Sequence, residues 1–131
     1  MSALIIEDET TSQLVLHDFI SRMMNCDLAK NAWEGIRYFE TAYEEDRPYR
    51  LVTLDIVMPN VDGHQALHRL REIEEERGIP FGSGAKVLMV SAHSDIRNVA
   101  QAFRGLCDGF LEKPVSEESL RSTLQKLLGD A

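Results

Sequence analysis

The sequence has 131 residues, which is enough for one domain with a single hydrophobic core. Hydrophobic residues make up 44% of it and charged residues 27%, as in ordinary soluble globular proteins, and no apolar run approaches the roughly 20 residues that cross a membrane. The formal net charge is −8, which argues against direct binding of nucleic acid because such binding needs a basic surface.

The start of the chain and its cysteines favour a cytoplasmic protein. The first residues run into acid at Glu7 and lack the basic leader of a signal peptide. Cys26 and Cys107 match neither a disulfide framework nor a zinc pattern, so we interpret both as reduced thiols. We therefore expect a cytoplasmic location without membrane contact.

Short apolar runs alternate with longer amphipathic stretches, a pattern typical of strands and helices around a parallel sheet. Residues 3–6 form a continuous apolar run, as expected of a strand covered on both faces. The apolar residues of the first predicted helix recur with helical spacing: Leu16, Phe19, Ile20 and Met23. A weak strand follows at residues 27–29. Asn31, with Glu34 three residues later, predicts a capping box that opens a second helix. The buried stripe of that helix comprises Ala32, Ile36, Phe39 and Tyr43.

The middle of the chain repeats this alternation. Residues 51–54 are the third predicted strand, and the turn-forming segment 59–63 leads from it toward a third helix. That helix buries Ala66, Leu67, Leu70 and Ile73. Residues 87–90 are the fourth predicted strand.

The last third adds a strand between two helices. The fourth predicted helix carries Ile96, Val99, Ala100 and Phe103. Residues 110–111 lie in a short fifth strand, and Ser116 caps a final helix that buries Leu120, Leu124 and Leu127. The sequence therefore predicts an α/β domain with a doubly wound, five-stranded parallel sheet and five helices.

Polar side chains stand where several of these strands end. Glu7 and Asp8 follow the first predicted strand, and Asp55 ends the third. Ser91 ends the fourth strand, and Lys113 closely follows the fifth. Each residue alone has an ordinary interpretation as a cap, a turn residue or a surface charge. Because the working site of an open α/β sheet lies outside the carboxyl ends of its strands, their combination predicts one shared site.

The chemistry of these side chains favours phosphoryl transfer. Three clustered carboxylates repel one another, so Lys113 and a hard divalent cation would be needed as counter-charges. Asp8 and Asp55 suit direct ligation of Mg²⁺, and Glu7 suits direct or water-mediated ligation. Asp55 would attack phosphorus to form an aspartyl phosphate, while Lys113 offsets charge and Ser91 donates a hydrogen bond.

Four motifs occur in order along nearly the whole chain. They are Glu7-Asp8, the Asp-x-x-Met-Pro-x-x-Asp-Gly run of residues 55–63, Ser91-Ala92 and Lys113-Pro114. Together they resemble the receiver domain of two-component response regulators, in particular the stand-alone, chemotaxis-type receivers. The resemblance implies a flavodoxin-like fold with strand order 2-1-3-4-5. It also implies a single receiver domain over residues 1–131 with no effector domain.

The resemblance further implies how the site works. A sensor histidine kinase or a histidine phosphotransfer protein would phosphorylate Asp55, with Mg²⁺ held by Asp8, Asp55 and the backbone carbonyl of Val57. With Glu7 added, these residues make up the expected metal site, and Mn²⁺ is the alternative metal. The resemblance also implies a cis peptide bond between Lys113 and Pro114, which the small intrinsic preference of X-Pro bonds permits.

A switch and a tuned lifetime are also implied. Ser91 would move toward the phosphoryl group and Phe110 would turn inward behind it, although simple core packing is the alternative interpretation of Phe110. Val57 and His93, two residues after Asp55 and Ser91 respectively, would flank the path of the hydrolytic water and tune the phosphoryl lifetime. A role as an exposed turn residue is the alternative for His93.

The expected product is a phosphorylated surface that signals, and the chain is no enzyme beyond its own phosphorylation and dephosphorylation. We expect a monomer or weak dimer that meets its kinase through the first helix. An unknown downstream protein would bind around Arg97, Gln101, Phe110 and Arg121. A phosphorelay carrier, a phosphate sink and a non-phosphorylated pseudo-receiver are the alternatives.

Other readings of the motifs are weaker. An aspartyl-phosphate phosphatase would need an acid at position 57, which is Val57, and a flavin phosphate would be repelled by the acidic residues 7–9. His64 and His68 lack a third metal ligand. We interpret Trp33 and Tyr38 as packing residues, and residues 74–76 as a solvated acidic helix face.

Overall fold

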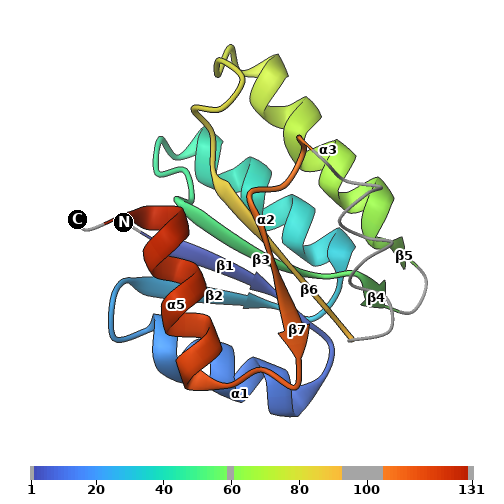
Figure 1. Ribbon diagram of the computed structural model, residues 1–131. Coiled ribbons are helices and arrows are strands. Elements are labelled where there is room, and N and C mark those ends of the chain that lie inside the picture. Colours follow the sequence, from blue (N-terminus) through green and yellow to red (C-terminus); the bar gives the residue numbers. More distant parts are fainter. Residues whose placement is uncertain (1, 59–60, 93–104, 130–131) are drawn as a thin grey trace.

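The computed structural model describes residues 2–58, 61–92 and 105–129, and only the backbone of residues 57, 58 and 61–64 (Figure 1). Five strands form one parallel sheet, with neighbours in the order β2-β1-β3-β6-β7. The strands are β1 (Ser2–Ile6), β2 (Asn25–Ala29), β3 (Leu51–Asp55), β6 (Lys86–Ala92) and β7 (Gly109–Lys113). Counted along the chain this is the order 2-1-3-4-5, so the predicted topology is confirmed.

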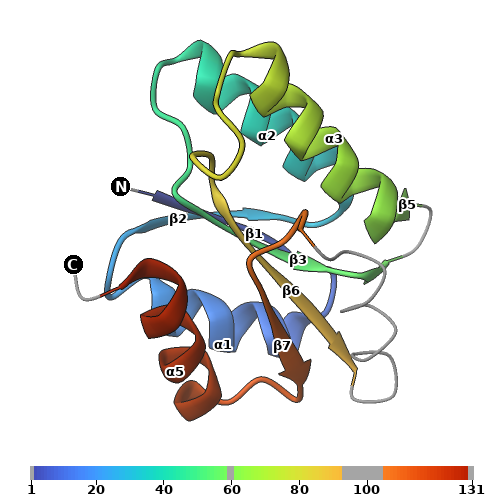
Figure 2. The same cartoon turned by 45° about the horizontal axis from the view of Figure 1, so that its top comes forward.

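Helices cover both faces of the sheet (Figure 2). Helices α1 (Thr10–Ile20) and α5 (Glu117–Leu128) lie on one face, and α2 (Ala32–Glu44) and α3 (Gly63–Glu76) lie on the other. Each face has its own hydrophobic core. The helix predicted from Ile96 to Phe103 falls outside the described residues, which therefore hold four of the five predicted helices.

Burial explains why the strands differ in how clearly they are predicted. Every residue of β3 is buried, as are Ala3 to Ile6 of β1, because both strands lie inside the sheet with helices on both faces. Strand β2 lies at the edge, and only Ala29 of its five residues is buried. Its weak apolar signal therefore follows from its position.

Local sequence sets the starts of two helices. At α2, the Asn31 side chain accepts a hydrogen bond from the Glu34 amide at 2.9 Å, as predicted. The Glu34 carboxylate reaches back to the amide of Lys30 at 3.2 Å instead of to Asn31, so only half of the predicted box forms. At α5, Ser116 accepts a hydrogen bond from the amide of Ser119, whose hydroxyl accepts one from the Ser116 amide.

Two short strands follow β3 and lead into α3. They are β4 (Val57–Met58) and β5 (Val61–Asp62), which pair in antiparallel fashion. Of the segment 59–63 that the sequence marks as a turn, β5 occupies residues 61 and 62. The predicted cis peptide bond between Lys113 and Pro114 is confirmed.

Four predictions about packing are wrong, including that for Tyr38, which is 37% exposed. Met23 is 48% exposed, because α1 ends at Ile20 and the following turn buries Met24 in its place. Trp33 is 63% exposed in the first turn of α2, so it is not a packing residue. Glu74 is buried and does not belong to a solvated face.

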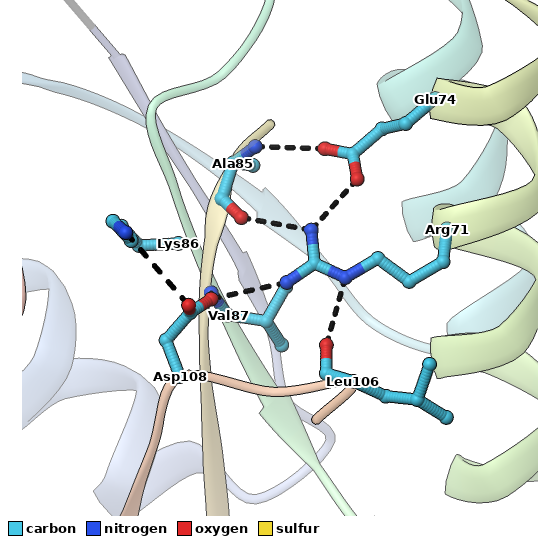
Figure 3. Close-up of polar contacts among 7 residues, drawn as sticks. All are labelled: Arg71, Glu74, Ala85, Lys86, Val87, Leu106 and Asp108. Atoms are coloured by element: carbon cyan, nitrogen blue, oxygen red, sulfur yellow. Dashed lines mark hydrogen bonds and ion pairs between the residues drawn. The ribbon is translucent and has the colours of Figure 1, made fainter. Parts of the chain in front are cut away.

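The burial of Glu74 has a clear cause (Figure 3). Its carboxylate pairs with the Arg71 guanidinium at 2.7 Å and accepts a hydrogen bond from the amide of Ala85, also at 2.7 Å. Arg71 lies three residues before Glu74 on α3, whereas Ala85 belongs to the loop before β6, which no pattern along the helix predicts.

Candidate functional site

The predicted site residues meet at the carboxyl ends of the strands. Asp55 is the last residue of β3 and Lys113 the last residue of β7, while Glu7 directly follows β1. The strand register aligns these ends, since Ile6 lies beside Leu54 in the sheet. Residues that are 106 positions apart in the chain thereby come into contact.

Lys113 holds the cluster together. Its Nζ lies 3.1 Å from Glu7 Oε2 and 3.2 Å from Asp55 Oδ2, close enough for a hydrogen bond to each carboxylate. The Glu7 and Asp55 side chains are 1% and 3% exposed, and that of Lys113 is 17% exposed. The ammonium is therefore a shared counter-charge for two buried carboxylates.

The cluster nevertheless has too little positive charge. Glu7, Asp8 and Asp55 each place a carboxylate oxygen within 4.8 Å of the others. Burial, followed by the hydrogen bond and the charge of Asp55, raises the pKa of Glu7 to about 8. Burial and Asp55 raise the pKa of Asp8 as well. Burial opposes the charge of Lys113, but Glu7 and Asp55 outweigh it and raise the pKa of its ammonium.

These donors fit a hard divalent cation. All three ligand groups are carboxylates, which Mg²⁺ and Mn²⁺ prefer, and Asp8 is exposed so that water can complete the coordination. A doubly charged cation would also relieve the repulsion that raises the carboxyl pKa values. No other group of at least three potential metal ligands occurs among the residues described.

The backbone around Glu7 is held by residues that sequence reasoning missed. The Glu7 amide donates to the Ala29 carbonyl at 3.1 Å, and the Gln13 side chain donates to the Glu7 carbonyl. The Glu9 amide donates to Glu7 Oε2 at 3.1 Å. Only the acidic run of residues 7–9 hinted at these roles, and nothing in the sequence pointed to Gln13.

Two further predicted residues lie near this edge. Ser91 follows Val90, the residue that pairs with Asp55, and its side chain is buried. Its hydroxyl has no hydrogen-bond partner among the residues that the structure describes. Phe110 lies beside Met89 in β7, half-buried against the core on the α2 and α3 side of the sheet.

The remaining predicted residues contribute less. His93 falls outside the described residues, and Val57 is described by its backbone alone, in β4. His68 is exposed, and the side chain of His64 is not described. Both cysteines carry thiols. Within the described ranges, no helix has the length and apolar character needed to span a membrane.

Comparison with known proteins identifies the family. Residues 3–125 match the response regulator receiver domain. The chain belongs to this family. Its members are the receiver modules of two-component signalling, so the predicted resemblance and the fold class are confirmed together.

Curated relatives support the assignment. The chain is 31% identical to the response regulator Rre1 of Synechocystis over 130 residues, covering 98% of this chain and 52% of that protein. It is 29% identical to the two-component response regulator ORR41 of rice, covering 94% of this chain and 91% of the relative. The chain spans about half the length of the first of these relatives.

Solved structures share the fold. A CheX–CheY–BeF3–Mg complex from Borrelia burgdorferi contains a chain with a TM-score of 0.77 and 24% identity, covering 98% of this chain and 89% of that one. The receiver domain of the histidine kinase CKI1 from Arabidopsis thaliana has a TM-score of 0.79 and 18% identity, covering 98% and 90%. At these identities the likeness concerns the fold alone.

Proposed function

We propose that the chain accepts a phosphoryl group on Asp55 from a sensor histidine kinase or a histidine phosphotransfer protein. The observation that carries this proposal is the shared contact of Lys113 with buried Asp55 and Glu7, beside Asp8. Phosphorylation would then change the surface that a downstream protein binds. Beyond its own phosphorylation and dephosphorylation the chain would catalyse no reaction.

The transfer is a displacement at phosphorus. An oxygen of Asp55 forms the new bond to phosphorus, the bond from phosphorus to the donor imidazole nitrogen breaks, and its electron pair stays on that nitrogen. Lys113 is within reach of Asp55 and would offset the charge of the transferred group. Ser91 has a buried hydroxyl with no partner among the described residues, which suits a hydrogen bond to a phosphoryl oxygen.

We further propose a Mg²⁺ site at this cluster, with Mn²⁺ as the alternative. Asp8, Asp55 and the Val57 carbonyl would hold the ion, with Glu7 bound directly or through water. The ion would supply positive charge to the phosphoryl oxygens. Since the pKa of Glu7 is raised to about 8, binding of the cation would be linked to release of a proton from this carboxyl.

The switch and the lifetime are proposals of the same kind. Ser91 and Phe110 would move together on phosphorylation, and the half-buried Phe110 side chain has exposed surface that an inward turn would bury. Val57 and His93 would flank the hydrolytic water. Unchanged positions of Ser91 and Phe110 on binding of a phosphoryl analogue would contradict the switch.

Partners are proposed from the family. The kinase would bind near α1, and the downstream protein near Phe110 and Arg121, together with Arg97 and Gln101, which lie outside the described residues. A cytoplasmic monomer or weak dimer is the expected form. A phosphorelay carrier or phosphate sink would be recognised by onward or reverse transfer to a histidine phosphotransfer protein.

A phosphotransfer assay tests the central proposal. The protein is incubated with Mg²⁺ and either acetyl phosphate or a panel of phosphorylated histidine phosphotransfer proteins, and the phosphoprotein is detected by intact mass. Asp55→Asn should remove the label, and a chelator should suppress it. Asp46→Asn is the matched control, because Asp46 is exposed at a φ of 58°, which asparagine also adopts. The proposal fails if neither donor labels the wild type.

A further inference from the structure

A third carboxylate faces Lys113 from the solvent side. Glu9 Oε1 lies 4.0 Å from Lys113 Nζ, and the Glu9 side chain is 55% exposed. The Glu7 and Asp55 carboxylates that contact the same ammonium are almost fully buried. Glu9 therefore stands on a solvent-exposed side of the site, from which a small phosphodonor can approach.

The Glu9 carboxylate is held in this position. The hydroxyl of Ser12, a residue only 3% exposed, donates a hydrogen bond to Glu9 Oε1 at 2.5 Å. The Glu9 amide is tied to Glu7, and its carbonyl accepts from the Gln13 amide at 3.0 Å at the start of α1. Because backbone and side chain are both anchored, the negative charge stays at the entrance instead of swinging into solvent.

Glu9 has no evident part in the transfer itself. It does not belong to the three carboxylates whose oxygens lie within 4.8 Å of one another, and Asp55 and Glu7 lie closer to Lys113. What it adds to the site is negative charge near the entrance. That charge repels an anion that approaches from solvent, and bulk salt screens the repulsion.

We propose that Glu9 is a specificity residue that disfavours small anionic phosphodonors and so reserves Asp55 for a donor protein. The inference rests on the proposed function, since it concerns access to the same acceptor. A donor protein docks through a surface of complementary charge, and positive groups on that surface would offset the charge of Glu9. A small donor such as acetyl phosphate brings only its negative charges.

The affected reaction is defined. With acetyl phosphate, an Asp55 oxygen forms the bond to phosphorus, the bond from phosphorus to the acetyl oxygen breaks, and the electron pair leaves with acetate. Glu9 forms no bond in this step. It acts on the approach of the dianion, so it should alter the second-order rate of labelling and leave the subsequent hydrolysis rate unchanged.

Glu9→Gln tests the inference with small donors of different charge. A unit charge about 8 Å from a dianion in water-like surroundings corresponds to roughly a fivefold change in rate. We therefore expect the variant to be labelled roughly fivefold faster than the wild type by acetyl phosphate at low salt. The gain should be smaller with phosphoramidate, which is monoanionic overall, and should shrink as salt is added.

Glu45→Gln is the matched control. Glu45 is exposed and lines a hollow with Ser2 and Asn25, at the amino ends of β1 and β2 and hence opposite the site. The substitution changes the net charge of the protein by the same amount as Glu9→Gln. It should leave both labelling rates unchanged, and neither variant should alter labelling by a phosphorylated histidine phosphotransfer protein by more than about twofold.

The outcomes separate the two proposals. If the wild type is labelled and Glu9→Gln matches it at low salt, the role of Glu9 is wrong while the proposed function stands. A gain that is independent of salt and of donor charge also overturns it, because it indicates a structural effect through Lys113. If no donor labels the wild type or the variant, the proposed function fails and the inference falls with it.

Discussion

Two charged clusters occupy opposite ends of the same sheet and are built on different rules. At the amino ends of β6 and β7, Arg71 donates to the Leu106 carbonyl at 2.7 Å and to the Ala85 carbonyl at 2.9 Å (Figure 3). It also pairs with Glu74 at 2.7 Å and with Asp108 at 3.0 Å. One guanidinium thus ties α3 to the segments that precede β6 and β7.

The acids of the Arg71 cluster have partners of their own. Glu74 accepts from the amide of Ala85 at 2.7 Å, and Asp108 accepts from the amide of Val87 at 2.8 Å. Lys86 adds a longer contact to Asp108, at 3.8 Å. Charge and hydrogen bonding are matched at this end of the sheet.

The cluster around Lys113 is not matched in this way. The carboxylates of Glu7, Asp8 and Asp55 crowd around one ammonium, and Ser91 Oγ is buried without a hydrogen-bond partner among the described residues. A buried polar atom without a partner is costly in a region that only supports the fold. At the carboxyl ends of the strands, the same imbalance is what the proposed cation and phosphoryl group would relieve. The same residue types are therefore fully paired at the amino ends of the strands and incompletely paired at the carboxyl ends, where the proposed phosphorylation site lies.

The largest expected effect is the dependence of the free energy of unfolding on pH. The folded state raises the pKa of Glu7 from 4.5 to about 8, so it keeps a proton that the unfolded chain releases. Stability without metal should therefore fall as the pH rises through this window, by at most about 1.4 kcal/mol per pH unit. Glu7→Gln should flatten the dependence, as measured by urea unfolding with a chelator present. If the wild type and Glu7→Gln show the same dependence of stability on pH, the raised pKa of Glu7 is wrong.

Breaking the matched cluster should be the next largest effect. Arg71→Met leaves Glu74 and Asp108 without their shared cation and should lower the free energy of unfolding by about 3 kcal/mol. Arg47→Met is the control, because Arg47 is 77% exposed and its one ion pair with a described residue is to exposed Glu45, so it should change stability by less than about 1 kcal/mol. Equal losses in urea unfolding would show that the Arg71 cluster is not special.

Substitution of Gly84, which lies against Glu74, should perturb the Arg71 cluster less than the loss of Arg71 does. A methyl group at Gly84 would collide with the Glu74 carboxylate and push it from the amide of Ala85. Gly84→Ala should therefore cost about 2 kcal/mol in chemical denaturation. Ser83→Ala, an exposed neighbour, should have little effect. Full stability of Gly84→Ala would mean that the carboxylate contact is dispensable.

Removing one acid from the Lys113 cluster should have the smallest effect on the free energy of unfolding, and it should stabilise the protein. Asp55→Asn removes one of three crowded carboxylates and keeps the pair of Lys113 with Glu7. We expect the metal-free variant to be more stable than the wild type by about 1 kcal/mol, as followed by thermal unfolding. Added Mg²⁺ should narrow the difference by stabilising the wild type. A destabilised Asp55→Asn would instead indicate that Lys113 depends on both carboxylates.

The chain order of residue types was enough to predict the architecture and most of the candidate site. Continuous apolar runs such as residues 3–6 mark strands buried on both faces, and parallel strands necessarily bring their carboxyl ends to one edge. Glu7, Asp55 and Lys113 could therefore be placed together without coordinates. The cap at Ser116 was predictable as well, because it depends on neighbours within one turn.

Other features depended on contacts between elements that no local pattern encodes. The sequence predicts Glu74 to be a solvated charge, but packing of α3 against the loop before β6 buries it. The sequence predicts Trp33 to be a packing residue, but the orientation of α2 leaves it exposed. The position of Glu9 required the residue that precedes α1 to lie near Lys113 at the carboxyl end of β7, where Ser12 and Lys113 approach its carboxylate. Periodicity in the sequence determines which face of a helix or strand is apolar. Only the packed arrangement of the elements decides which charged groups come within a few ångströms of one another. The reason is that Coulomb and hydrogen-bond energies depend on distances in space and not on spacing along the chain.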